Sequence, residues 1–290
     1  MHRGKHQKRK PRRKSNVTIK LCLLLFFGGV FIISAIMAGS IMLEQKTARD
    51  AYRDIRQQTQ PYTSVTSSIK NVTGSENTDT QIPPTTEDPQ QTVTLDFAPL
   101  KEKNKEIVAW LFAEGTSIDY PVLHTDNNSY YLNHLYTGES NKSGSLFLDY
   151  RNTGLFTERN TVIYGHHMNN GSMFSALELY KEQDFYDNHP TMQLYTPEGD
   201  YLIELICGTV EDGNYEFVQF AFVDEDAFTE YVDAQRSRST FQSNVELSPG
   251  DRIVSLCTCS YEWNNARYMV IGKLTPVMGD GIYTTLNMTP

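Results

Sequence analysis

Cysteine is scarce in this sequence, with four Cys among 290 residues. C-x-x-C spacing occurs nowhere, and no His pair with H-x₃₋₅-H spacing follows residue 43. Because these spacings are typical of structural zinc sites, we expect neither a metal nor another cofactor. The sequence also contains no internal repeat, and its length suits one large domain or two small ones.

Acidic residues are absent from the first 43 positions, which hold nine Lys or Arg. The rest of the chain contains 17 basic and 35 acidic residues, a net formal charge of −18. A body with this charge repels a polyanion, so we expect it to bind no nucleic acid. The basic run Lys8–Lys14 is better explained by membrane topology than by nuclear targeting, because an apolar segment follows it.

Charge of either sign is absent from residues 21–43, a run of 23 residues. A helix of this length can cross a hydrocarbon core of about 30 Å. The basic residues before it predict a cytoplasmic tail over 1–20 and an extracellular location for everything after residue 43. A cleaved signal peptide is the alternative, but its apolar region is normally shorter, and Met37-Ala38-Gly39-Ser40 is a weak cleavage site. A retained single-pass anchor is therefore favoured.

Residues 44–94 offer few apolar side chains to bury. The first part, Glu44–Gln60, is charged and rich in Gln, and we expect it to leave the membrane as a helix. The part after it, Pro61–Val93, is rich in Ser, Thr, Pro, Asn and Gln, which is typical of a flexible spacer. This composition predicts a stalk over 44–94 and a folded domain over 95–290.

Eight short apolar runs in this domain predict the strands of a closed or nearly closed β-barrel, a mainly β fold. They are Ile118–Leu123, Ser145–Leu148, Thr161–Tyr164, Met192–Tyr195, Tyr201–Val210, Glu216–Phe222, Arg252–Thr258 and Tyr268–Leu274. A helix is predicted over Lys101–Phe112, where four apolar residues fall on one side. Two further helices are predicted, one over Met173–Tyr180 and one after Val223, where Asp224 can cap the N-terminus.

Three of the four cysteines follow the predicted anchor, and three thiols cannot all pair within one chain. Cys257 and Cys259 are two residues apart on one predicted strand, about 6.5 Å between Cα atoms, near the limit for a disulfide. Cys207 could pair with either if its strand is a neighbour. Spacing alone therefore leaves a reactive cysteine and a structural one equally open.

His166 and His167 directly follow the predicted strand Thr161–Tyr164 and Gly165. A His on a loop just after a strand can point into a cleft and act as acid and base near neutral pH. The remaining histidines are interpreted as structural or as part of the tail. Arg267 opens the run Tyr268–Leu274, and it is either an exposed strand-end charge or a donor to an oxyanion.

These segments resemble a sortase, and specifically one of class B. Ser255-Leu256-Cys257-Thr258-Cys259 is similar to the Thr-Leu-x-Thr-Cys signature, with Ser255 in place of Thr and Cys257 at the variable position. Asn160–Met168 resembles the catalytic-His segment, in which the His after Gly is His166. Arg267 lies where the family has its catalytic Arg. The resemblance covers about residues 100–275 and includes Ile118–Val122, Tyr130–His134, Gly144–Asn152 and Gly171–Phe174.

The resemblance implies an eight-stranded barrel with N-terminal helices and a helix inserted before the penultimate strand. It implies Cys259 as nucleophile, His166 as acid and base, and Arg267 as oxyanion donor. Ser255, Thr258 and Tyr164 are candidates for substrate contact. The implied partners are surface proteins or pilins with a C-terminal sorting signal, and the acceptor would be an amine of a cell-wall precursor or a pilin lysine. The implied location is the outer face of a bacterial membrane, with residues 21–43 as anchor.

Two other functions stay open at this stage. A hydrolytic cysteine peptidase would use the same three residues, and a catalytically silent binding module would keep the barrel. The presence of all three candidate catalytic residues argues against the silent module. The sequence does not separate wall anchoring from pilus polymerisation, nor does it identify the sorting motif.

Overall fold

The computed structural model describes residues 16–59, 62–65, 91–259 and 264–277. It divides into two compact units, one that ends at Thr47 and one that begins at Ala48. The first unit is most of helix α1 (Asn16–Gln58), whose side chains from Leu21 to Leu43 are almost all exposed. The helix from Lys20 onward is long and apolar enough to cross a membrane by length and composition. The basic run Lys8–Lys14 lies outside the described residues.

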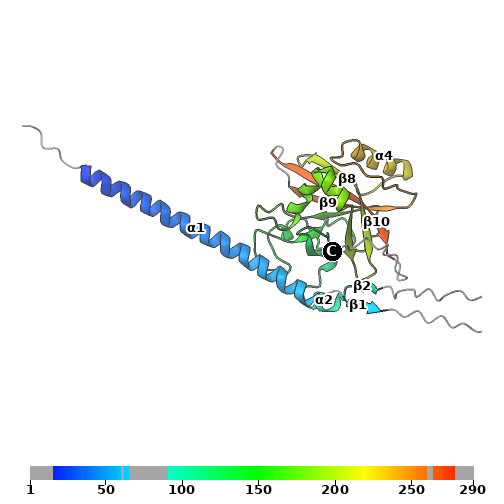
Figure 1. Cartoon of the computed structure of the whole chain (residues 1–290), viewed down its shortest axis with the longest axis horizontal. Helices are drawn as coiled ribbons and strands as arrows, with labels where there is room; N and C mark the ends of the chain where they lie inside the picture. The colour runs from blue at the N-terminus through cyan, green and yellow to red at the C-terminus, as the bar shows by residue number, and fades with distance from the viewer. Residues whose placement is uncertain (1–15, 60–61, 66–90, 260–263, 278–290) are drawn as a thin grey trace, which may run out of the picture. The chain divides into compact units, whose positions relative to one another are not determined.

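Eight strands form a closed barrel in the second unit (Figure 1). Around the ring they follow the order β10-β8-β7-β3-β4-β5-β6-β9, and two of the pairings, β4 with β5 and β6 with β9, are parallel. Their bounds are β3 Ile107–Phe112, β4 Asp119–Leu123, β5 Leu146–Leu148, β6 Asn160–Tyr164, β7 Thr191–Tyr195, β8 Tyr201–Asp212, β9 Arg252–Cys259 and β10 Ala266–Pro276. The predicted eight-stranded barrel is therefore confirmed.

Short elements connect and flank these strands. The helices are α2 Ala98–Lys103, α3 Gln183–Asn188 and α4 Glu225–Arg236, and two 3-10 helices are η1 Tyr130–Leu132 and η2 Phe174–Lys181. A separate antiparallel pair, β1 Tyr62–Val65 with β2 Gln91–Thr94, lies within the segment predicted as stalk. Residues 66–90 of that segment lie outside the described residues.

Two of the sequence predictions were wrong. The helix predicted over Lys101–Phe112 is instead α2, which ends at Lys103, followed by strand β3. β3 pairs with β4 on one side and β7 on the other, so tertiary pairing overrides a spacing that also fits a helix. The strand predicted over Glu216–Phe222 is an irregular segment, in which Val218 is buried and the Phe side chains pack against a core.

Two hydrophobic cores explain why the barrel strands are so apolar. Along β9, Val254 and Leu256 belong to the core that fills the barrel, while Ile253 and Cys257 belong to a second core on the outside. Because side chains alternate between the two faces of a strand, both faces of β9 are buried. The second core lies beneath α4, to which it connects through Phe228 and Val232.

Helix α4 forms at the predicted place (Figure 1). The side chain of Asp224 accepts a hydrogen bond from the backbone N–H of Ala227 at 2.9 Å, which caps the helix as expected. Phe228 and Val232 lie one turn apart and form its buried stripe. The guanidinium of Arg159 pairs with Glu225 at 2.8 Å and lies 3.8 Å from the centre of the Phe228 ring. These contacts cover the outer face of β8, β9 and β10.

The last turns of α1 belong to the barrel unit. Tyr52 and Ile55 are buried, and the Tyr52 ring meets the Tyr120 ring edge to face with 5.0 Å between centroids. Arg56 donates from Nε to the backbone oxygen of Asp119 at 2.8 Å. The helix predicted over Glu44–Gln60 is therefore present to Gln58, continuous with the apolar segment, and the start of the domain at residue 95 stays a prediction.

Candidate active site

Strand β9 brings together the chain segments that carry the candidate catalytic residues. It lies between β6, with which it runs parallel, and β10, with which it runs antiparallel. Cys259 is the last residue of β9 and pairs with Arg267 on β10. Neighbouring strands lie about 4.8 Å apart, so the backbones of these two residues are adjacent.

The parallel pairing with β6 brings the chain segment before His166 beside β9. Tyr164, the last residue of β6, pairs with Cys257, and the backbone N–H of Gly165 donates to the Cys257 oxygen at 3.1 Å. His166 and Cys259 each follow these paired residues by two positions. The register therefore carries the chain toward His166 beside the end of β9 that holds Cys259, although about ninety residues separate the two in sequence.

His166 is partly exposed and is held from both its backbone and its ring. Its ring nitrogen Nε2 lies 2.7 Å from the backbone oxygen of Leu132, and its own backbone oxygen accepts from the N–H of Phe174 at 2.9 Å. Gly165 permits this close packing, because a Cβ there would lie 2.4 Å from Cδ2 of Leu146. A side chain at position 165 would also clash with the Phe174 ring, 2.7 Å from the added Cβ.

His167 is held in a different environment. It forms an isolated backbone bridge with Met173, and its Nδ1 lies 3.8 Å from Oε1 of Glu178. That carboxylate also contacts the Lys181 ammonium at 2.9 Å. The His167 side chain therefore faces a carboxylate of η2, whereas the His166 ring is held by the Leu132 backbone oxygen; His166 as acid and base stays a prediction.

Arg267 presents a guanidinium that is only lightly engaged. Its Nη1 donates to the backbone oxygen of Ala266 at 3.0 Å, and a Cβ built on Gly213 would lie 3.1 Å from its Cζ. Glu211, its partner across the β8–β10 ladder, instead pairs with Arg238 at 2.9 Å. Within the described part of the chain, no carboxylate forms an ion pair with Arg267. Most of its donors are therefore available to an oxyanion.

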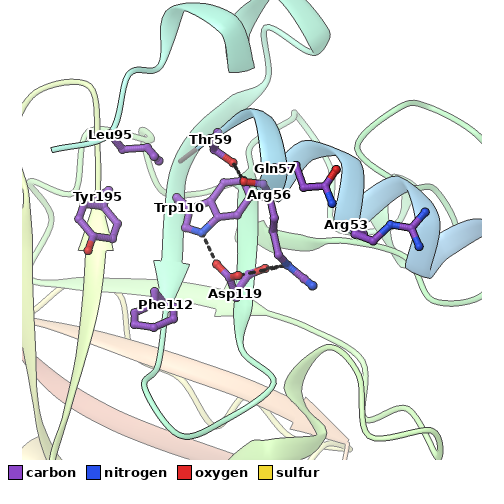
Figure 2. A pocket seen from close by; sticks show the side chains of 9 residues that line it. All are labelled: Arg53, Arg56, Gln57, Thr59, Leu95, Trp110, Phe112, Asp119 and Tyr195. Carbon is purple, nitrogen blue, oxygen red and sulfur yellow. Dashed lines mark hydrogen bonds and ion pairs between the residues drawn. The ribbon is translucent and has the colours of Figure 1, made fainter. Parts of the chain in front are cut away.

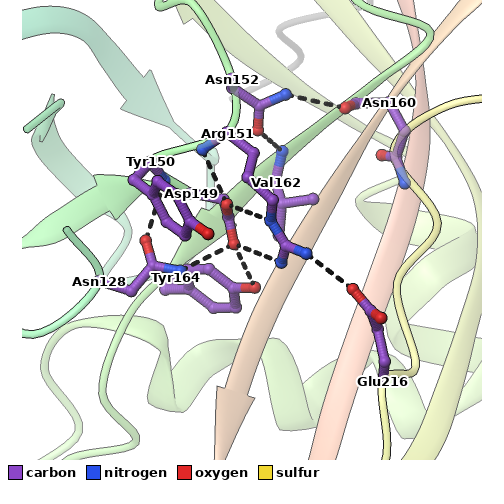
Figure 3. A network of polar contacts seen from close by, with 9 residues as sticks. All are labelled: Asn128, Asp149, Tyr150, Arg151, Asn152, Asn160, Val162, Tyr164 and Glu216. Carbon is purple, nitrogen blue, oxygen red and sulfur yellow. Dashed lines mark hydrogen bonds and ion pairs between the residues drawn. The ribbon is translucent and has the colours of Figure 1, made fainter. Parts of the chain in front are cut away.

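A buried carboxylate supports the end of β6 (Figure 3). Asp149 is fully buried and accepts from the Tyr164 hydroxyl at 3.0 Å and from the Asn128 amide at 2.8 Å. Arg151 donates to both of its oxygens, at 2.8 and 3.0 Å. Burial alone would raise the pKa of Asp149, but these hydrogen bonds, led by those from Arg151, hold it below its usual value.

Arg151 extends this network to the irregular segment after β8. Its Nη1 donates to Oε1 of Glu216 at 2.7 Å, and its guanidinium lies 3.8 Å from the centre of the Phe220 ring. Sequence reasoning missed this role. The signal was the run Asp149-Tyr150-Arg151-Asn152, in which charged and amide residues directly follow a buried strand.

The three residues predicted to contact substrate have the following surroundings. Ser255 is fully buried and its hydroxyl donates to Oδ1 of Asn160 at 2.9 Å (Asn160 is drawn in Figure 3). Thr258 is buried, and its hydroxyl oxygen has no hydrogen-bond partner among the residues that the structure describes. Tyr164 is partly buried and bonded to Asp149. Burial raises the pKa of its hydroxyl, with smaller contributions from Cys257 and Asp149. These contacts support strands β6 and β9, and contact with substrate stays a prediction for all three.

Cys207 and Cys257 are buried free thiols. Strand β10 lies between β8 and β9, so a disulfide between Cys207 and Cys257 is excluded by the sheet order. Burial raises the pKa of Cys207 to about 12, and it raises the pKa of Cys257 well above the ordinary thiol value. Both are therefore protonated at neutral pH and are poor nucleophiles.

A cavity of about 310 Å³ lies where α1 meets the barrel (Figure 2). Its walls include Trp110 and Phe112 of β3 and Tyr195 of β7, and Arg56 of α1 lies at its edge. Trp110 donates from Nε1 to Oδ1 of Asp119 at 2.7 Å. Strand β3 is on the opposite side of the ring from β9, so this cavity is separate from the candidate active site.

Comparison with known proteins agrees with this geometry. The family model of the Sortase domain matches residues 111–275. Sortase B of Listeria monocytogenes is 38% identical over 177 residues, which are 60% of this chain and 72% of the relative. Sortase B of Staphylococcus aureus is 32% identical over 190 residues, which are 65% of this chain and 78% of the relative.

Solved structures give the same result. The crystal structure of Staphylococcus aureus Sortase B is similar with a TM-score of 0.59 and 31% identity, covering 63% of this chain and 87% of that one. A Staphylococcus aureus sortase B–substrate complex is similar with a TM-score of 0.60 and 32% identity, covering 63% and 85%. Clostridium perfringens Sortase B is similar with a TM-score of 0.59 and 31% identity, covering 62% and 99%. Because the family match spans more than half of the chain and both curated relatives are Sortase B proteins, this chain belongs to the sortase family of cysteine transpeptidases.

Proposed function

We propose that this chain is a membrane-anchored transpeptidase of class B that cleaves a C-terminal sorting signal after a Thr residue. Cys259 is its nucleophile, and the acyl group passes to an amine on the outer face of the membrane. The observation that supports this proposal is the register: Cys259 pairs with Arg267, and Tyr164 pairs with Cys257, two residues before His166 and Cys259 respectively. A nucleophile, an acid–base group and an oxyanion donor are the three parts that acyl transfer needs.

The first half-reaction forms a thioester. The thiolate of Cys259 attacks the backbone carbonyl carbon of the Thr, and a carbon–sulfur bond forms. Arg267 donates to the oxyanion of the tetrahedral intermediate and, as an adjacent cation, also favours the thiolate. The carbon–nitrogen bond then breaks, and the His166 imidazolium gives its proton to the departing amine.

The second half-reaction releases the product. An acceptor amine attacks the thioester carbon, His166 takes a proton from that amine, and Arg267 again stabilises the oxyanion. The carbon–sulfur bond breaks and restores the Cys259 thiolate. The acceptor is an amine of a cell-wall precursor or a pilin lysine. Transfer must be faster than hydrolysis, so water should be kept from the thioester.

The anchor fits this chemistry. With residues 1–20 in the cytoplasm and residues 21–43 in the membrane, the barrel would lie on the side where membrane-tethered substrates are found. Tethering the enzyme and its substrates to one surface raises their effective concentration, so weak intrinsic affinity suffices. The exposed apolar side chains of α1 from Leu21 to Leu43 support this role.

The proposal is tested by screening sorting-signal peptides with the wild-type chain and with Cys259→Ala. Mass spectrometry should find an acyl group on Cys259 of the wild type, and an added amine should shift the product from free acid to amide. Both glycine-type amines and lysine peptides are supplied, so wall anchoring and pilin polymerisation are compared directly. If only free acid forms while amine is abundant, the chain is a hydrolytic peptidase and the transfer proposal fails.

A further inference from the structure

The end of α1 contacts the loop that leads into β5. The Tyr52 side chain is 3% exposed, and its hydroxyl lies 2.7 Å from the backbone oxygen of Gly144 and 2.9 Å from Oγ of Ser145. Since a carbonyl oxygen only accepts, the Tyr52 hydroxyl donates to Gly144. The end of α1 thus fixes the backbone at positions 144 and 145 through a buried hydrogen bond.

Positions 144 and 145 in turn hold the segment that contains η1. The backbone N–H of Ser145 donates to the oxygen of Tyr131 at 2.9 Å, and its Oγ donates to the oxygen of His134 at 3.0 Å. Gly144 has φ of +58°, and a Cβ built on it would lie 2.8 Å from the Leu132 oxygen. The two segments are therefore packed backbone to backbone, and a shift in one displaces the other.

The Leu132 oxygen is the atom that lies 2.7 Å from Nε2 of His166. Because this oxygen only accepts, the hydrogen bond requires a proton on Nε2. In the neutral imidazole the other nitrogen, Nδ1, is then the acceptor, and it is the nitrogen that exchanges protons with the reacting groups. The Leu132 carbonyl thus selects both the tautomer and the orientation of the His166 ring.

We infer that Tyr52 is a positioning residue for His166, acting through Gly144, Ser145 and the Leu132 carbonyl. The inference rests on the proposed function, because it assigns His166 the acid–base role. Its consequence is that the last turns of α1 form part of the catalytic apparatus in addition to joining the barrel to its anchor. The helix segment involved belongs to the same compact unit as the barrel.

The test compares Tyr52→Phe with Tyr136→Phe in the full-length chain in detergent. Tyr136 is a matched control, since its hydroxyl donates to the Ala51 oxygen at 3.2 Å and its ring centroid lies 5.7 Å from that of Tyr52. Both variants remove one hydroxyl from the same aromatic cluster, but only Tyr52→Phe removes the hydrogen bond to Gly144 in the segment that leads into β5. We expect it to lower kcat about tenfold or more with KM changed less than about twofold, because small misplacements of catalytic groups are costly. Tyr136→Phe should retain wild-type kcat.

A spectroscopic readout separates positioning from loss of structure. ¹⁵N-histidine NMR of the substrate-free wild type should show neutral His166 as the Nε2–H tautomer, assigned by comparison with His166→Asn. Tyr52→Phe should shift His166 to a mixture of tautomers, and Ser145→Ala should do the same if Tyr52→Phe fails to fold. An Nδ1–H tautomer in the wild type, or equal kcat and equal tautomers in the two Phe variants, would overturn the inference. Failure of the proposed function appears separately, as absence of an acyl-enzyme on Cys259 in the wild type.

Discussion

Cys259 and Arg267 are directly opposite each other in the antiparallel ladder of β9 and β10. A cation fixed on the strand next to the proposed nucleophile could donate to the oxyanion without moving during the reaction. The guanidinium also has donors to spare, since its hydrogen bond to the Ala266 oxygen uses only one of them. This relationship gives the first prediction.

Replacing Arg267 with Ala should lower kcat/KM by about 10²- to 10³-fold, the usual effect of removing one oxyanion donor. Arg267→Lys should recover only part of the loss, because an ammonium keeps the charge but lacks the planar fork of donors. Steady-state kinetics with a sorting peptide measures both variants. Arg252→Ala is the matched control, because this guanidinium is at the other end of β9 and contacts the Phe156 oxygen. Equal losses in Arg267→Ala and Arg252→Ala would refute the oxyanion role.

The two buried thiols give a second prediction. Cys257 and Cys207 are inside a hydrophobic core and have raised pKa values, so thiol reagents at neutral pH should label neither in the folded chain. Cys257→Ala should retain most transfer activity and lose about 1 kcal/mol of stability from the lost packing. Mass mapping of labelled peptides and activity assays check this. If Cys257→Ala abolishes turnover while its circular dichroism is unchanged, the assignment of Cys259 rather than Cys257 as the nucleophile is wrong.

The sequence predicted the parts of the site that depend on local patterns. The helix after Val223 carries an N-cap at Asp224, and the β-branched apolar run from Arg252 to Thr258 predicted strand β9. Each of these signals lies within one short stretch of the sequence. The expected sorting-signal chemistry, by contrast, came from the resemblance to a family motif and not from residue spacing.

Other features depend on long-range pairing and could not be predicted from local sequence patterns. Ile107–Phe112 is apolar on both faces, so periodicity does not separate strand from helix. The segment Glu216–Phe222 is a short apolar run like those of the strands, but its aromatic side chains pack against a core and against Arg151 without a partner strand. The pairing of Tyr164 with Cys257, two residues before His166 and Cys259, is encoded by no local signal.

The buried carboxylate gives a third prediction, on stability in acid. The pKa of Asp149 is lower in the folded chain than its ordinary value, so the folded state binds fewer protons there. Its stabilising contribution is complete above about pH 4 and is lost as pH falls through the folded-state pKa. Urea unfolding of the wild type should therefore weaken steeply below about pH 4.

Asp149→Asn removes this pH dependence in part and destabilises the chain at neutral pH. We expect a loss of about 2 kcal/mol, below the roughly 3–5 kcal/mol for fully buried pairs, because the Arg151 side chain is 38% exposed. Glu216→Gln is the control, since that carboxylate also pairs with Arg151 but is exposed and should change stability little. An acid limb of equal slope in wild type and Asp149→Asn would contradict the assignment.

The fourth prediction concerns Gly144, which brings the η1 segment against His166. A Cβ at position 144 would lie 2.5 Å from the Tyr131 oxygen and 2.8 Å from the Leu132 oxygen, so Gly144→Ala must displace the carbonyl that holds His166. We expect kcat to fall about 10- to 100-fold, the usual cost of displacing a catalytic group by about 1 Å. Gly138→Ala is the control, since Gly138 also has a positive φ, +82°, but a Cβ there meets only the Tyr130 hydroxyl at 3.6 Å. Both variants share the backbone strain of a left-handed residue, and only Gly144→Ala disturbs the acceptor, so equal kcat values in the two would show that the Leu132 carbonyl does not orient the ring.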